Sequence, residues 1–126
     1  MTFPTPEAGL VISYSYLWRY EHELGAEEGR KNRPCLIIMA VENHDGTILV
    51  TVAPITHNIP SGRNAGLEIP TKVKKYLGLD SEKSWVIISE VNQFIWPGYD
   101  VHPIYGSKHQ FSYGFLPPKL FEQIKS

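Results

Sequence analysis

The sequence predicts a mainly β protein with short helices, folded as a small, strongly bent sheet or SH3-like barrel with a C-terminal helix. Three observations favour this fold class. Most apolar residues fall in short runs or alternate with polar residues, as strands require. Clusters of Gly, Pro, Asn and Asp separate these runs, and only two short stretches have a helical pattern. The length of 126 residues is typical of one hydrophobic core, so we expect a single domain over residues 1–126.

The first strand is expected at residues 10–16. The alternation of its side chains indicates a half-buried strand with one strongly apolar face, made of Leu10, Ile12, Tyr14 and Tyr16. Residues 17–32 then form a polar stretch that carries both charge signs. Roughly fifteen residues is long for a connection inside a compact domain, and loops of that length are often functional.

Two strongly apolar strands follow at residues 34–42 and 47–56, with the turn sequence Asn-His-Asp-Gly at residues 43–46. If they pair as an antiparallel hairpin, the start of the first lies beside the end of the second. This pairing brings the guanidinium of Arg33 next to the hydroxyl of Thr56 on one rim of the sheet. A fixed cation beside a hydroxyl suits a phosphate group better than it suits a packed core.

The second half of the chain predicts two helices and one long strand. A short helix is expected over residues 70–77, because Pro70 opens it, Lys residues lie in its last turn and Gly78 follows. Residues 85–95 show the longest β-like pattern, with polar side chains on both faces midway, where we expect the strand to leave the core. Residues 117–125 predict a closing amphipathic helix.

The segment of residues 96–113 is rich in Gly, Pro and aromatic side chains, including Trp96, Tyr105 and Phe111. We expect these aromatics to form a lid over the barrel or a subunit interface, rather than a surface that stacks on bases. They are more than one small barrel readily hides, and exposed aromatic clusters usually mark an interface. A twofold-symmetric homodimer is therefore expected.

Composition excludes several classes of protein. The lone Cys35 excludes an internal disulfide, and its apolar surroundings indicate a buried, inert thiol. No N-terminal run resembles a signal peptide and no apolar run is long enough to span a bilayer, so we expect a cytoplasmic protein with no membrane partner. The five histidines lack metal-ligand spacing, and no phosphate-binding glycine loop or Gly-x-Ser-x-Gly motif is present. No metal or cofactor is expected.

Four short motifs in register carry a family resemblance. Gly29-Arg30-Lys31-Asn32-Arg33-Pro34 before an apolar strand, and Val52-Ala53-Pro54-Ile55-Thr56 at the end of the next, resemble the MazF/PemK family of toxin endoribonucleases. The segments Ile87-Ile88-Ser89-Glu90 and Gly114-Phe115-Leu116-Pro117 follow in the family's order. The resemblance implies an SH3-like barrel, a homodimer that cleaves RNA at the dimer surface, no metal, and a cognate antitoxin.

The resemblance also implies site residues. Arg33 and Thr56 match the family's catalytic Arg and Thr, and Glu90 falls where many members have an Asp. RNA contacts are then expected from a further set of residues in the first loop and next to the catalytic positions: Glu28, Arg30, Lys31, His57 and Asn92. We also expect Lys72, Lys74 and Lys75 to attract the RNA backbone.

The residue types themselves are compatible with metal-free RNA cleavage, independently of the family resemblance. Metal-free cleavage of RNA needs a base for the 2′-OH, a cation for the charge that develops on the phosphate, and an acid for the leaving 5′-oxygen. Glu90 is the candidate base, Arg33 the phosphate clamp and possible acid, and Thr56 a hydrogen-bond donor to the phosphate. The neighbouring His57 is a second candidate acid.

The rival hypothesis is a barrel of the same fold that binds a protein or nucleic-acid target without cleavage. The formal net charge of −1 favours this rival, because it does not by itself indicate nucleic-acid binding. The set of Arg33, Thr56 and Glu90 favours the nuclease, for which single-stranded RNA is the expected substrate.

Overall fold

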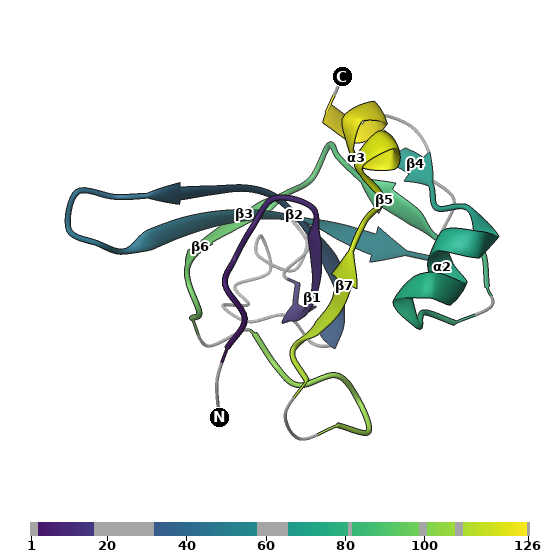
Figure 1. Ribbon diagram of the computed structural model, residues 1–126, viewed down its shortest axis with the longest axis horizontal. Coiled ribbons are helices and arrows are strands. Elements are labelled where there is room, and N and C mark those ends of the chain that lie inside the picture. Colours follow the sequence, from purple (N-terminus) through teal and green to yellow (C-terminus); the bar gives the residue numbers. More distant parts are fainter. Residues whose placement is uncertain are drawn as a thin grey trace, which may run out of the picture.

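The computed structural model describes residues 3–16, 32–57, 66–80, 82–98, 101–107 and 110–125. Within these ranges the chain forms one curled antiparallel sheet with two short helices, which confirms the predicted fold class (Figure 1). The strands are β1 (Leu10–Ser15), β2 (Asn32–Glu42), β3 (Ile48–Thr56), β4 (Gly66–Glu68), β5 (Trp85–Ile87), β6 (Asn92–Ile95) and β7 (Ser112–Phe115). The helices are α2 (Thr71–Leu77) and α3 (Pro118–Lys125).

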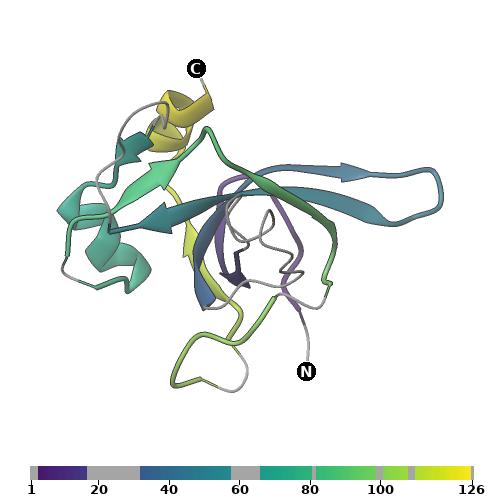
Figure 2. The same cartoon turned by 180° about the vertical axis from the view of Figure 1, so that it is seen from behind.

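The sheet is built around the predicted β2–β3 hairpin, which pairs from Cys35 opposite Pro54 to Glu42 opposite Ile48. Its strand order is β4-β5-β3-β2-β1-β7, and β6 also pairs with β3. The register shifts between Ile37 and Met39 on β2 and between Val11 and Ile12 on β1. Such bulges increase the local twist, and the sheet curls accordingly (Figure 2).

The prediction of one strand over residues 85–95 is wrong, because the segment forms two strands, β5 and β6, with a break at residues 88–91. β5 pairs with Ile55 and Thr56 of β3, whereas β6 pairs with residues 49–52. The partner strand therefore leaves β3 beside Pro54, which has no N–H to donate to a ladder. Glu90 lies in this break.

Alternate side chains of the central strands enter two different apolar clusters on opposite faces of the sheet. Val11 and Leu36 belong to the cluster that the helices cover, together with Leu120, Phe121 and Ile124 of α3. The neighbours of Val11 and Leu36 point the other way, into the curl of the sheet. β1 is consequently buried on both faces along its whole length, not half-buried as its alternation predicted.

The described aromatic side chains of the segment after β6 pack mainly inward, which favours the predicted lid over the predicted subunit interface. Phe111 is buried, and its ring lies 4.6 Å from that of Phe3. Trp96 packs against the same cluster and meets Phe3 edge to face, whereas Tyr105 is fully exposed. Tyr99 lies outside the described residues, and β7 at the end of this segment was not predicted.

Among the described residues, the structure has no helix that is both long and apolar enough to cross a membrane.

Candidate functional site

The start of β2 and the end of β3 form one wall of a pocket of about 380 Å³, which we call the rim pocket. Extending the β2–β3 register by two residues beyond Cys35 and Pro54 sets Arg33 opposite Thr56. Both residues line the rim pocket, as the hairpin predicted. The other described residues that line it are Asn32, Pro34, Ile55, His57, Leu79, Asp80 and Ser84.

Arg33 is half-buried between β1 and β3, with Tyr14 opposite it on β1. Burial raises the pKa of the Cys35 thiol far above its ordinary value, and the positive charge of Arg33 opposes the rise. Cys35 is therefore the inert thiol that its apolar context predicted.

Thr56 is the last residue of β3, and His57 comes directly after it in the lining of the rim pocket. Thr56 is buried and pairs with Trp85 of β5, so the strand is anchored on both sides at this point. His57 follows immediately, with 47% of its side chain exposed. The two residues thus present a hydroxyl and an imidazole from neighbouring positions of one strand end.

A second layer behind the rim pocket is made by α2 and the loop that follows it. Gly78 takes the left-handed conformation that ends the helix, and the N–H groups of Gly78 and Leu79 bond back to the carbonyls of Lys75 and Lys74. This cap turns the chain so that Asp80 and Ser84, in the loop after α2, contact Lys74 of the helix. Asp80 and Ser84 of that loop reach the rim pocket.

Lys74 lies at the centre of this second layer and is only 4% exposed. Its Nζ donates to Oδ1 of Asp80 at 2.7 Å, to Oγ of Ser84 at 2.6 Å, and to the backbone carbonyl of Glu82. A buried ammonium has to be paired and fully hydrogen-bonded, and these three acceptors match its three donors. The expectation that Lys74 attracts the RNA backbone is therefore wrong, whereas Lys72 and Lys75 are exposed.

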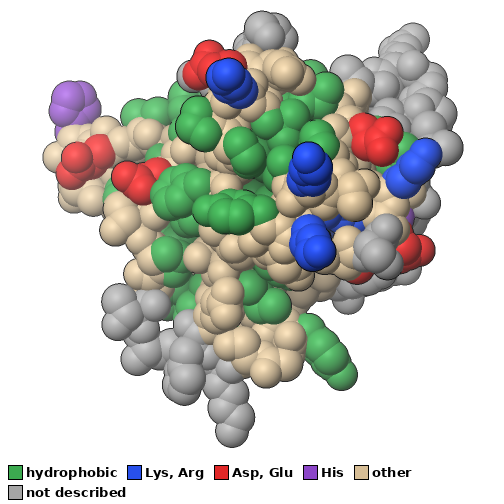
Figure 3. Space-filling model, turned by 45° about the vertical axis from the view of Figure 1, so that its right-hand side comes forward, with side chains coloured by type: hydrophobic (Ala, Val, Ile, Leu, Met, Phe, Trp, Pro, Cys, Tyr) green, Lys and Arg blue, Asp and Glu red, His purple; other side chains and the backbone are tan. Residues whose placement is uncertain are grey.

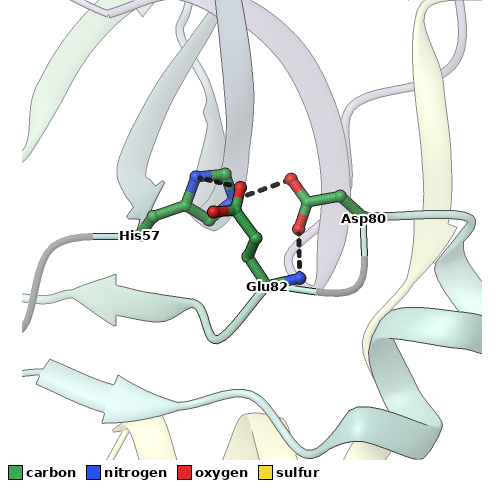
Figure 4. A group of neighbouring side chains, drawn as sticks. All are labelled: His57, Asp80 and Glu82. Atoms are coloured by element: carbon green, nitrogen blue, oxygen red, sulfur yellow. Dashed lines mark hydrogen bonds and ion pairs between the residues drawn. The ribbon is translucent and has the colours of Figure 1, made fainter.

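His57 lies between two carboxylates of the same loop (Figure 4). Its Nε2 is 2.7 Å from Oδ2 of Asp80, and its Nδ1 is 3.4 Å from Oε2 of Glu82. Asp80 thus connects Lys74 to His57, because its carboxylate contacts the buried ammonium on one side and the imidazole at the rim pocket on the other.

This arrangement changes the pKa of Asp80. Its partial burial would raise the pKa of the carboxyl, but the hydrogen bond from Lys74, the charges of His57 and Lys74, and the N–H of Glu82 together hold that pKa below its ordinary value. The carboxylate is therefore kept ionised between two basic groups.

An imidazole and two carboxylates, from His57, Asp80 and Glu82, are groups that can bind a metal ion. Their potential ligand atoms lie within 4.8 Å of one another. Exposed groups of this kind are common without an ion, and here Lys74 already donates to Asp80. An added cation would stand close to that buried ammonium, which opposes its binding.

The remaining predicted site residues lie elsewhere. Glu90 is half-buried, and its backbone carbonyl accepts a hydrogen bond of 2.6 Å from the hydroxyl of Tyr16. Neither Glu90 nor Asn92, at the start of β6, is among the described residues that line the rim pocket. Glu28, Arg30 and Lys31 lie outside the described residues.

Sequence reasoning missed Asp80 and the burial of Lys74. One signal was present: Lys74 precedes Leu77 by three positions, so the two side chains share a helix face, and Leu77 belongs to the core. A lysine on the apolar face of a short helix indicates a buried charge that needs an acidic partner nearby.

Comparison with known proteins gave one finding. The family model described as PemK-like, MazF-like toxin of type II toxin-antitoxin system matches residues 16–94, more than half of the chain. No curated protein and no solved structure gave a significant match. The matched region contains both strands of the hairpin, the whole rim pocket and its second layer. The chain therefore belongs to the PemK-like, MazF-like toxins of type II toxin-antitoxin systems.

Proposed function

We propose that this toxin is an endoribonuclease that cleaves single-stranded RNA in the cytoplasm without a metal ion, and thereby inhibits growth. The observation that carries the proposal is the meeting of Arg33, Thr56 and His57 in one pocket at the end of the hairpin. A guanidinium, a hydroxyl and an imidazole are the groups that bind a phosphate and move a proton beside it.

In the proposed reaction the 2′-oxygen attacks the adjacent phosphorus, the O2′–P bond forms and the P–O5′ bond breaks. The proton of the 2′-OH passes to a base, and an acid gives a proton to the leaving 5′-oxygen. The products are a 2′,3′-cyclic phosphate and a 5′-OH end. Arg33 stabilises the charge on the phosphorane, Thr56 hydrogen-bonds a phosphate oxygen, and His57 is the proton donor.

Glu90 remains our candidate for the base. Its flanking residues Ile88 and Val91 line an apolar groove rather than the rim pocket, so RNA would have to pass from one to the other. We therefore expect Glu90→Gln to reduce cleavage less than a change to Arg33 or His57. Single-stranded RNA suits this extended path, because its bases can be splayed out while the 2′-OH stays accessible.

A homodimer is proposed from a different surface than the aromatic segment. The groove beside Ile88 and Val91 has a volume of about 710 Å³ and is lined by apolar side chains from β2, the β5–β6 connection and α3. Met39, Val41 and Ile95 are also large apolar side chains that stay exposed. Figure 3 shows hydrophobic side chains gathered across one face of the molecule. A second copy of the chain would cover such a face, and light scattering that reports a stable monomer would contradict this.

The family implies an antitoxin partner. We propose that its disordered acidic-hydrophobic tail blocks the site, with carboxylates against Arg33 and the neighbouring Arg30 and Lys31. A disordered segment can cover a large surface although it loses entropy on binding. Such an antitoxin should suppress cleavage and raise the Tm of the toxin through mass action.

The decisive experiment incubates purified toxin with a long single-stranded RNA in EDTA. We expect cleavage that leaves a 2′,3′-cyclic or 3′-phosphate and a 5′-OH end. Cleavage that stops in EDTA and returns with Mg²⁺ or Mn²⁺ would instead assign His57, Asp80 and Glu82 to a metal. No cleavage of any RNA would favour a binding protein of the same fold that acts without catalysis.

A further inference from the structure

We propose that Asp80 and Lys74 are positioning residues for His57, and that Glu82 is a displaceable carboxylate that leaves Nδ1 of His57 when RNA enters the rim pocket. The inference rests on the proposed ribonuclease activity for its catalytic part. Its geometric part concerns the orientation of one imidazole ring and can be tested without any substrate.

Lys74 cannot move independently of the loop that holds Asp80. Its ammonium is buried and donates to Asp80, to Ser84 and to the carbonyl of Glu82. Its own carbonyl accepts the N–H of Leu79 at 2.9 Å. Backbone and side chain of Lys74 thus hold Leu79, Asp80 and Ser84, so displacing Asp80 would leave a buried charge short of an acceptor.

Both carboxylate oxygens of Asp80 have partners. Oδ1 accepts from Lys74 at 2.7 Å and from the backbone N–H of Glu82 at 3.1 Å. Oδ2 is left for Nε2 of His57 at 2.7 Å. The carboxylate is therefore fixed before it meets the imidazole, as an orienting group must be.

The two carboxylates that contact His57 are unequal. Asp80 meets Nε2 at 2.7 Å and is anchored by a buried lysine, whereas Glu82 meets Nδ1 at 3.4 Å with 71% of its side chain exposed. A long, exposed side chain gains little from a surface ion pair and loses conformational entropy in it. Glu82 is consequently the partner that RNA can displace, while Asp80 stays in place (Figure 4).

This inequality decides which nitrogen reacts. When the P–O5′ bond breaks, Nδ1 gives its proton to the leaving 5′-oxygen, and the electron pair of the broken bond ends on that oxygen. The ring that remains is neutral and keeps its proton on Nε2, hydrogen-bonded to Asp80, which is the tautomer that the carboxylate stabilises. Water returns a proton to Nδ1 before the next turnover.

The test compares Asp80→Asn with two matched variants, Glu82→Gln and Asp45→Asn. In Asp80→Asn the amide oxygen can still accept from Lys74, so the fold is retained, but the amide NH₂ then faces Nε2 and opposes a proton there. Asp45 is a second aspartate whose pKa is lowered, and it lies in the β2–β3 turn away from the rim pocket. Asp45→Asn therefore controls for the loss of one negative charge.

The first readout is the ¹⁵N and ¹H NMR spectrum of the His57 ring in the toxin without RNA. We expect a slowly exchanging, downfield Nε2–H signal in the wild type, in Glu82→Gln and in Asp45→Asn, and its loss in Asp80→Asn. The second readout is cleavage kinetics. For Asp80→Asn we expect kcat to fall by roughly tenfold or more with little change in KM, because proton transfer is affected and binding is not. Glu82→Gln should lose far less.

The outcomes separate this inference from the function on which it rests. A wild type that cleaves no RNA would overturn the proposed function and the catalytic part, while the NMR signal would still decide the positioning part. Cleavage by the wild type with equal kcat in Asp80→Asn would overturn the inference alone. An Nε2–H signal that survives in Asp80→Asn, or that Glu82→Gln removes instead, would also overturn it.

Discussion

The two ends of the β2–β3 hairpin carry the same kinds of side chain and use them differently. At the turn, His44 and Asp45 are exposed, and Oδ1 of Asp45 accepts the N–H of Thr47 at 3.0 Å and its hydroxyl at 2.6 Å. At the rim, His57 meets Asp80, whose partners come from α2 and from the loop behind it. Asp45 therefore hydrogen-bonds only within the β2–β3 turn in the contacts described, whereas Asp80 connects His57 after β3 to Lys74 of α2.

The two ends differ in whether a buried residue packs behind the aspartate. Nothing in the described part of the chain packs a second layer behind the turn, where residues 41–46 are exposed. The rim has Lys74, a buried cation that holds Asp80 from behind. A histidine near an aspartate is therefore weak evidence for a site, and an aspartate held by a buried partner is stronger evidence.

The largest expected difference between the two ends of the hairpin is in RNA cleavage, when Arg33 at the rim is changed. Arg33→Ala should lower cleavage by about a hundred- to a thousand-fold, or roughly 3–4 kcal/mol, because a fixed cation at the transition-state phosphate is lost. Arg33→Lys should also fail, since an ammonium cannot give the bidentate contact. His44→Ala at the turn end is the control and should leave the rate unchanged. Folded Arg33→Ala with the wild-type rate would remove Arg33 from the site.

The next effect concerns stability rather than activity. Lys74→Met should lower the free energy of unfolding by about 1–3 kcal/mol, because Ser84 and the carbonyl of Glu82 lose their buried donor. Lys75 is the next residue of the same helix and is exposed, so Lys75→Met should change stability by no more than about 0.5 kcal/mol. Urea denaturation followed by circular dichroism measures both. Equal midpoints for the two variants would contradict the role given to Lys74.

The parts of the fold that depend on neighbours in sequence could be predicted. The hairpin follows from two apolar runs around a turn sequence, and its register brings Arg33 to Thr56 without further information. The break between β5 and β6 could not be predicted from residues 85–95 alone. The break lies beside Pro54 of β3, which has no N–H to donate, and which strand would lie beside Pro54 depends on the three-dimensional pairing.

Only the part of the rim pocket that the hairpin forms could be predicted from the sequence, because the rest depends on three-dimensional packing. Arg33 and Thr56 lie on paired strands, so their proximity follows from the hairpin. Asp80 lies in a polar loop, where an acidic residue is ordinary, and only the packing of α2 brings it to His57. A carboxylate in an apolar strand is unusual, which makes Glu90 a candidate from sequence, yet the strand is interrupted there and the residue is half-buried.

The smallest expected effect is on the pH dependence of stability, and it tests the comparison between Asp45 and Asp80 directly. The pKa of each carboxyl is lowered in the folded protein: by the hydrogen bonds of Thr47 for Asp45, and for Asp80 by Lys74 and His57 against the opposing effect of burial. A lowered pKa means that the unfolded chain binds more protons in acid. Each aspartate therefore adds stability above its unfolded pKa of about 3.9, and that stability is lost as the pH falls through the folded value.

The two losses should differ, although their direction is the same. Protonation of Asp45 affects only the exposed turn, whereas protonation of Asp80 removes the charge beside the buried ammonium of Lys74. Urea denaturation between about pH 6 and pH 3 should show a shallower loss of stability in Asp80→Asn than in Asp45→Asn, each relative to the wild type. Added salt should reduce the difference only in part, because Asp80 is half-exposed but Lys74 is not. A constant offset between Asp80→Asn and the wild type across this range would mean that the charge of Asp80 does not contribute to stability, which would contradict the role given to the rim aspartate.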